Sequence, residues 1–561
     1  MKRTVMSCFC MVFLTVLIIL SLLHGGVAAS IQSQEKGITA SQEQIKELRE
    51  ARKKLAHRKR RIIINDDGGL MVYGLKEATR QAYFAALAGW EGKQVDALFY
   101  STWCSGFGVF TYNTKVGEVL TCTKDVLANN KTADFIKQGT DALHLNIDFC
   151  RKNNIEIFWS MRMNDTHDVN DDLTFSRLKK EHPQWLIGSK ENKPKFGAWT
   201  AVDYTHPEIR DLAYRFFEEV CENYDVDGIE MDFMRDLTCF KRHAMGADAT
   251  QDECDMMTEL IGRIRQMTER VGLKRGRPIL VSVRVPDSVG YCKAAGLDIV
   301  RWMQDGLIDM LVVSCYYRLN PWEVSVQLGH KYGVAVWPCL SESRIKGGES
   351  EKIRQSMECY RGRAMNVWNS GADGVYLFNY GDPKSCLWSE IGEPEILEKL
   401  DKVYCIAPLD SGKANGWARQ GWSRFLNLPW WSPLYPLPLR EGEVITFYLD
   451  VGEDIGKNIA NGLAPDIKLR LQVKNVPGDE KLTVVLNDQE LVNNPSLTKA
   501  ITLSSDIDAN EWFEYNVEPA IVQKGANRIK LTLWECGAKN PTLNDVLLFV
   551  RYPKSKADKV Q

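Results

Sequence analysis

The chain has 561 residues, which is long enough for two or three domains and too long for one ordinary hydrophobic core. Its 44% hydrophobic and 26% charged residues are typical of a globular protein and exclude bulk disorder and collagen-like repeats. The 71 Lys and Arg residues nearly balance the 73 Asp and Glu residues, and this net charge of −2 argues against nucleic acid bound through an overall positive charge.

Residues 1–29 have the pattern of a secretory signal peptide. Lys2 and Arg3 precede an apolar run over residues 11–23, and small residues at 27–29 suit cleavage. The apolar run is shorter than the roughly 20 residues of a spanning helix, so we expect an exported protein with no stable membrane span. The alternative is an uncleaved anchor. Residues 30–60 form a polar lead-in whose basic end, residues 52–61, is typical of a solvated arm, with a basic binding patch as the alternative.

The cysteines are scattered without any CxxC pair. An odd number of the 15 remains once Cys8 and Cys10 are removed with the signal peptide. The pattern therefore predicts neither a zinc site nor a disulfide framework, and no cofactor is expected.

Between residues 61 and 404, short β-prone apolar runs alternate with amphipathic stretches. In the stretch that begins at Pro207, for example, Ile209, Phe216 and Val220 fall on one helical face. Eight strands alternating with helices predict a (β/α)8 TIM barrel over 61–404. An open doubly wound sheet is the alternative, but no GxGxxG or Walker loop follows any run. The eight runs are residues 62–64, 95–100, 155–161, 226–232, 278–283, 310–315, 334–337 and 375–378.

The remainder of the chain changes character twice. Residues 405–440 are rich in Trp and Pro and predict a linker that packs between domains, although Trp430 and Trp431 are also able to stack on a sugar. From 441 to 561 the apolar period is two, which predicts an all-β jelly-roll sandwich. Its expected strands are residues 445–451, 467–473, 482–486, 512–517, 529–534 and 546–552.

The fourth barrel strand carries the clearest pattern for chemistry. Glu230 and Asp232 alternate along an apolar strand, so both point to the same side near its end, where catalytic groups of a barrel project. A buried charge there must be paired or lie in a cleft. The alternative to a catalytic role is a buried ion pair with Arg162 or Arg284.

The pattern Asp-Gly-Ile-x-x-Asp over residues 227–232 resembles that of glycosyl-hydrolase-like barrels, in several of which the second acid is catalytic. Chitinases have DxxDxDxE on this strand, but Met234 stands where they have the proton-donating Glu, which argues against that chemistry. The better resemblance, over about residues 61–400, is to the family ten-like glycosyl hydrolase group. The turns at 485–491 and 524–529 resemble those of galactose-binding-like modules.

Polar and aromatic side chains follow the other predicted strands, as expected of a cleft that stacks sugar faces and binds hydroxyls. The predicted substrate-binding residues are Arg162, Asn164, Asp165, His167, Arg284, Tyr316, Tyr317, Trp337, Asn379 and Tyr380. Asp66 and Asp67 either contribute or form a simple turn. A metal at Asp165, His167 and Asp168 is the alternative, but only one His is present, so no metal site is predicted.

These features predict an exported glycoside hydrolase acting on a polysaccharide or oligosaccharide. Cleavage needs two carboxyl groups. Asp232 is the expected nucleophile or base, and the candidate acids are Glu342, Asp287 and Glu230, with Glu342 preferred because it comes from across the barrel mouth. The alternatives are a non-catalytic carbohydrate-binding barrel and a metal-dependent hydrolase or deacetylase. Arg162, Arg284 and Arg318 favour an acidic or sulfated glycan, unless they only neutralise nearby acids.

Overall fold

The computed structural model describes residues 41–553 apart from 104–105, 342–347, 407–421, 429–430, 432–435, 476–481, 493–511 and 536–539. The predicted signal peptide, Glu342 and Trp430 lie outside the described residues. Among the helices that are described, none combines the length and the hydropathy that a bilayer crossing requires.

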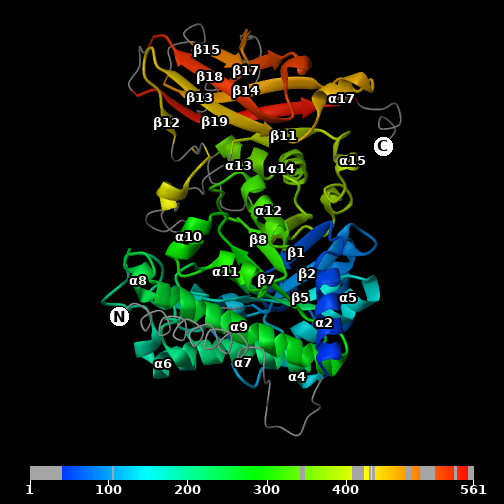
Figure 1. The fold of residues 1–561 in the computed structure, drawn as a ribbon, viewed down its shortest axis with the longest axis vertical. Coiled ribbons are helices and arrows are strands. Elements are labelled where there is room, and N and C mark those ends of the chain that lie inside the picture. Colours follow the sequence, from blue (N-terminus) through cyan, green and yellow to red (C-terminus); the bar gives the residue numbers. More distant parts are fainter. Residues whose placement is uncertain are drawn as a thin grey trace, which may run out of the picture. The chain divides into compact units, whose positions relative to one another are not determined.

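Eight parallel strands close into a barrel in the order β1-β2-β5-β6-β7-β8-β9-β10, with β10 pairing back onto β1 (Figure 1). Each predicted run coincides with one of these strands, so the predicted TIM barrel is confirmed. The strands are β1 (Ile62–Asp66), β2 (Val95–Ser101), β5 (Glu156–Arg162), β6 (Gly228–Asp232), β7 (Leu280–Val285), β8 (Met310–Val313), β9 (Ala335–Leu340) and β10 (Val375–Phe378).

Helices connect successive strands and cover the barrel. Pro207 starts α7, as predicted, and α9 begins with a capping box between Thr250 and Glu253 and ends at Gly276, which adopts a positive φ of 73°. In Figure 1, α7 and α9 run side by side. The principal helices are α3 (Arg80–Leu87), α5 (Ala142–Asn153), α7 (Pro207–Asn223), α9 (Gln251–Arg275), α11 (Ile299–Gln304), α12 (Trp322–Lys331), α14 (Met357–Asn369) and α15 (Pro394–Leu397).

The basic run at 52–61 is exposed at Lys53, Lys54 and Lys59, as predicted, but two of its arginines are buried against the barrel. The run begins within α2 (Gln42–Ala56) and ends just before β1. Arg52 donates to Glu269 at 2.8 Å, and the fully buried Arg60 donates to Glu156 at 2.6 Å. Because Glu156 begins β5, these ion pairs hold the lead-in against the end of the barrel where the strands start.

One glycine in the barrel is required by a close approach. Gly228 begins β6, and a Cβ there would lie 2.1 Å from the ring of Phe158, which stacks on Phe99 inside the barrel. Replacing Gly228 with alanine should therefore lower the free energy of unfolding by about 1–3 kcal/mol through overpacking. Urea unfolding followed by circular dichroism measures the change.

Gly262 is the matched control for this prediction. It lies within α9, where an added Cβ would meet nothing within 4 Å. Alanine at this position should raise the free energy of unfolding by about 0.5–1 kcal/mol, because glycine loses more backbone entropy on folding. Equal effects of the two substitutions would contradict the packing role of Gly228.

The C-terminal region consists of two antiparallel sheets, ordered β11-β19-β14-β17, with β12 also on β19, and β13-β18-β15-β16. All the strands expected there are present. The predicted barrel boundary at residue 404 falls within β11. This strand pairs with β19 of the C-terminal region and is not part of the barrel. The strands are β11 (Lys402–Cys405), β12 (Leu437–Pro438), β13 (Val444–Val451), β14 (Asp466–Lys474), β15 (Leu482–Leu486), β16 (Gln489–Leu491), β17 (Trp512–Val517), β18 (Gly525–Leu533) and β19 (Thr542–Arg551).

Candidate active site

A polar layer crosses the centre of the barrel around Glu230. This side chain is fully buried, and it accepts hydrogen bonds from Ser160 Oγ at 2.6 Å, Tyr376 OH at 3.0 Å and Asn65 Nδ2 at 3.2 Å. Burial raises the pKa of Glu230 to about 7, and the nearby Arg284 only partly opposes that effect. Glu230 is therefore a neutral acid below that pH, and barrel side chains occupy its carboxyl group.

The raised pKa of Glu230 predicts a pH-dependent stability. The folded state holds this proton up to about pH 7, whereas the unfolded chain releases it near 4.5. The contribution of Glu230 is therefore fully present below pH 4.5 and is lost as the pH rises through 7, with a change of up to about 3 kcal/mol. In urea unfolding between pH 4.5 and 7.5, Glu230→Gln should lose less stability than the wild type. Asp66 and Asp287, whose pKa values burial raises to about 6, act in the same direction in both proteins.

Asp232 lies one layer closer to the mouth and is paired with an arginine. Its two oxygens accept from Arg284 Nε at 3.0 Å and Nη2 at 2.5 Å, and the backbone N–H of Met234 adds a bond at 2.9 Å. The aspartate is 1% exposed. This is the buried ion pair considered as the alternative from sequence.

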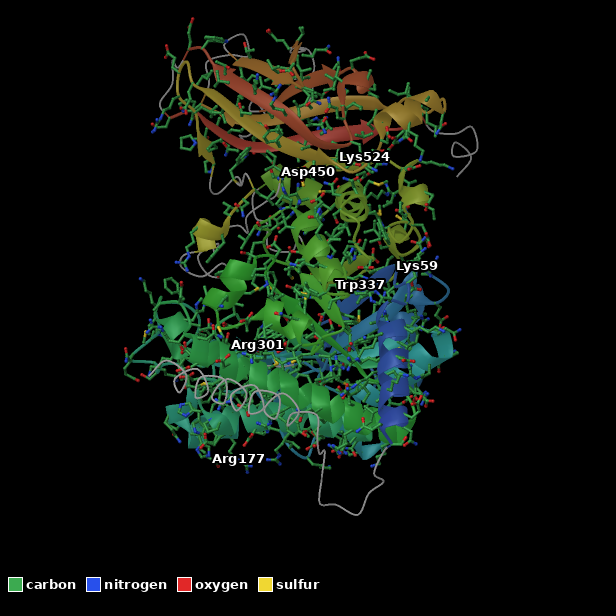
Figure 2. All side chains as sticks on the ribbon, viewed as in Figure 1. Lys59, Arg177, Arg301, Trp337, Asp450 and Lys524 are labelled. Atoms are coloured by element: carbon green, nitrogen blue, oxygen red, sulfur yellow. The ribbon has the colours of Figure 1, made fainter. Side chains whose placement is uncertain are left out.

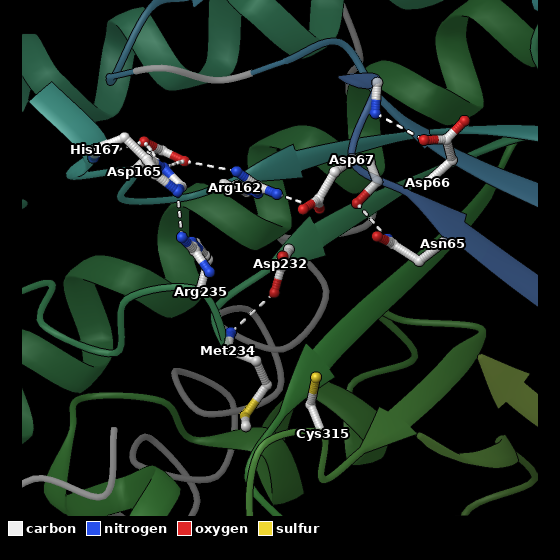
Figure 3. Close-up of polar contacts among 12 residues, drawn as sticks. Asn65, Asp66, Asp67, Arg162, Asp165, His167, Asp232, Met234, Arg235 and Cys315 are labelled. Carbon is white, nitrogen blue, oxygen red and sulfur yellow. Dashed lines mark hydrogen bonds and ion pairs between the residues drawn. The ribbon is translucent and has the colours of Figure 1, made fainter. Parts of the chain in front are cut away.

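An outer group of charges surrounds Arg162 at the end of β5 (Figure 3). Its guanidinium donates to Asp165 at 2.9 Å and also to Asp67, which follows β1. The carboxylate of Asp67 is 17% exposed. Although burial opposes it, the charge of Arg162, with those of Arg235 and Arg284, lowers the pKa of Asp67. The mouth therefore presents an ionised carboxylate held by guanidinium groups.

His167 and Arg235 complete this group. The ring of His167 is 36% exposed, and its Nδ1 lies 2.8 Å from Asp165. Arg235 contacts Nε2 of the same ring and donates to Tyr316 OH at 3.0 Å. Asp165 is fully buried, yet His167 and Arg162 outweigh the effect of burial and lower its pKa. Among the described residues, no group of His, Cys, Asp and Glu has the arrangement to hold a metal ion.

Aromatic rings adjoin these charges. Trp103 follows β2 and stacks on His167 with 6.3 Å between ring centroids and 30° between planes. Tyr73, in the short π-helix η1 (Leu70–Gly74) after β1, packs edge-on against Trp103 at 5.0 Å. Strand ends β1, β2 and β5 thus bring an aromatic surface beside Asp67 and Arg162.

Several predicted site residues have structural partners instead. Asn164 is buried and bridges two loops, since Nδ2 donates to the carbonyls of Val202 and Thr238. Asp287 accepts from the backbone N–H groups of Leu319 and Asn320, at 2.9 Å from one oxygen to each, and so holds the loop after β8.

Trp337 lies away from the mouth because β9 continues beyond it to Leu340. Its Nε1 donates to the carbonyl of Arg60, which precedes β1, and the ring is fully buried. Figure 2 labels Trp337 close to Lys59, the residue that precedes Arg60 in the chain. The sequence pattern ended the strand too early and therefore placed this ring at the wrong end.

The remaining predicted residues lie near the strand ends. Tyr316 contacts Arg235, while Tyr317 is buried edge-on to Tyr291. Asn379 is exposed after β10, with a positive φ of 50°. Tyr380 packs on Trp388 and contacts Ser385.

Arg235, Trp103 and Tyr73 lie at this site although they are not among the predicted site residues. Arg235 follows Asp232 by three residues, and Trp103 follows the end of β2 by two, so both positions carried a usable indication. The sequence contains no such indication for Tyr73, because its position beside Trp103 depends on the π-helix η1.

Residues 70–253 match the family described as Glycosyl hydrolase-like 10. This confirms the resemblance predicted from the strand motif, since the matched segment contains β2, β5 and β6 with Asp232. Together with the closed barrel, it identifies a glycoside hydrolase fold. No curated protein matches the chain.

Solved structures with low similarity include three glycosidases. Alpha-L-fucosidase isoenzyme 2 from Paenibacillus thiaminolyticus is 13% identical with a TM-score of 0.37, and the match covers 61% of this chain and 48% of that one, so the chain spans about half of its length. The PgaB (BpsB) glycoside hydrolase domain from Bordetella bronchiseptica is 9% identical with a TM-score of 0.39, covering 59% and 98%. A family 18 N-acetylglucosaminidase from Paenibacillus barengoltzii is 13% identical with a TM-score of 0.33, covering 57% and 95%.

Proposed function

We propose that the protein is an exported glycoside hydrolase that cleaves glycosidic bonds in a polysaccharide or oligosaccharide at the mouth of its barrel. The observation that carries the proposal is the convergence of Asp67, Asp165 and Asp232, from three separate strand ends, around Arg162 and Arg284. Paired acids at a barrel mouth are the groups that glycosidic cleavage requires.

Asp232 is proposed as the carboxylate that stabilises or attacks the anomeric carbon. Arg284 and the N–H of Met234 donate to it and fix its direction, which suits a carboxyl group that must meet developing positive charge. Asp67 is proposed as a second carboxylate of the site, and its lowered pKa and partial exposure support contact with a sugar.

The proton donor of this proposal is Glu342. A donor must be protonated when the leaving oxygen departs. Asp67 does not meet this requirement, because its pKa is lowered. Asp287 accepts hydrogen bonds from the backbone of the loop after β8, and Glu230 accepts hydrogen bonds from three side chains inside the barrel. Glu342 follows the end of β9 by two residues.

A carbohydrate-binding barrel without hydrolysis is the second candidate function. It is favoured by one observation, the burial of Asp232 against Arg284 at 1% exposure. In that case the ion pair only stabilises the barrel, and the mouth charges bind sugar hydroxyls or acidic groups.

Release of reducing ends from a panel of neutral, uronic and sulfated glycans tests the proposal. The wild type should turn over at least one class and should keep its rate in EDTA, whereas Glu342→Gln should lose most of it. Binding without turnover across the panel would favour the second candidate. Loss of activity on chelation would contradict a carboxylate mechanism.

A further inference from the structure

The backbone at Trp103 adopts a conformation that a tryptophan rarely takes. Its φ is +41°, in the left-handed region that favours glycine, immediately after β2 (Val95–Ser101). In addition, no described residue offers an acceptor to its buried indole Nε1. Both features cost folding free energy, and such costs concentrate at functional sites.

The surroundings of Trp103 combine aromatic faces with charges. Tyr73 is 43% exposed beside it, and His167 stacks on it while contacting Asp165 and Arg235. The π-helix that carries Tyr73 is itself a rare feature that occurs mostly at functional sites. The aromatic surface is therefore continuous with the charged group around Arg162.

We propose that Trp103 and Tyr73 form a sugar-stacking subsite of the barrel mouth. The occupant is a pyranose ring, whose C–H face packs on the aromatic surface while its hydroxyls meet His167 and Asp67. Apolar ring faces and equatorial hydroxyls are the two surfaces of a sugar, and the structure places a partner for each side by side. The subsite deepens the proposed function, because it makes a carbohydrate the ligand whether or not hydrolysis follows.

Binding to a printed array of neutral, uronic and sulfated oligosaccharides, with all variants made in an Asp232→Asn background, tests the subsite without turnover. Trp103→Ala should weaken every sugar signal at least tenfold, and Trp103→Phe should weaken it less. Tyr73→Ala, at an exposed position, should give an intermediate loss without affecting folding. Thermal unfolding of each variant separates weaker binding from misfolding.

Trp185 provides the matched control, because it also stacks on a histidine, His182, at 3.8 Å but lies after α6 (Arg177–Glu181). Trp185→Ala should leave the array pattern unchanged. An unchanged pattern in both Trp103→Ala and Tyr73→Ala, or the absence of any sugar signal from the Asp232→Asn protein, would overturn the subsite. If that protein binds sugars while the wild type hydrolyses none, the hydrolase proposal fails and the subsite stands.

Discussion

Replacing Asp232 with asparagine is expected to lower kcat/KM on a responsive glycan by about 10²–10⁴-fold, the usual worth of a carboxyl group that takes part in the chemical step. Asparagine keeps the size of the side chain and one acceptor for Arg284 but removes the charge. Initial rates of reducing-end release, measured with substrate far below KM, give the change.

The same substitution at Asp309 separates catalysis from stability. Asp309 accepts from Arg265 Nη2 at 2.5 Å and from the backbone N–H of Val281 at 2.8 Å, and it also pairs with Arg52 at 3.3 Å, so it is likewise a buried aspartate held by guanidinium and backbone partners. It lies just before β8, at the end of the barrel where the strands start. Asp309→Asn should retain the wild-type kcat/KM. Equal losses in the two variants would assign Asp232 a structural role.

Replacing Arg354 with methionine is expected to lower the free energy of unfolding by about 3–5 kcal/mol, because it leaves the carboxylate of Asp545 buried without its partner. Arg354 ends α13 (Gly348–Arg354), and it donates to Asp545 of β19 at 2.5 Å from Nη2. Both side chains are almost fully buried. Urea unfolding monitored by tryptophan fluorescence measures the loss.

Two further variants check the origin of this loss. In Arg354→Met/Asp545→Leu neither charge is left buried, and most of the stability should return. Arg424→Met removes an arginine from an exposed pair with Asp248, where a change within about 1 kcal/mol is expected. A double variant as unstable as the single one would show that the ion pair is not the cause.

The barrel could be predicted because its information is local. The apolar runs that form the eight barrel strands are bounded by polar turns, and Pro207 and an apolar face mark the start and the buried side of α7. The hydrophobic period and the residues that end each element depend only on neighbouring positions. They can therefore be read without knowledge of tertiary contacts. The position of Asp232 at the end of β6 followed in the same way.

The ends of the strands and the partners of charged side chains could not be predicted from the sequence as well as the strands themselves. The run over residues 334–337 predicts that the strand ends at Trp337, but pairing with β10 extends β9 to Leu340. Much of the basic run at 52–61 is exposed, as predicted, but Arg60 is buried against Glu156, a residue 96 positions away. The spacing of neighbouring residues does not indicate a partner so far away in the sequence.

The order of residues was enough to establish the barrel, the antiparallel sheets that follow it, and the aspartate on the fourth strand, because alternation and turn chemistry are local. Three-dimensional packing was needed to pair that aspartate with Arg284, to bring Asp67 onto Arg162 and to set Trp103 on His167. Electrostatic and stacking partners depend on distances between strand ends, and closure of the barrel is what sets those distances.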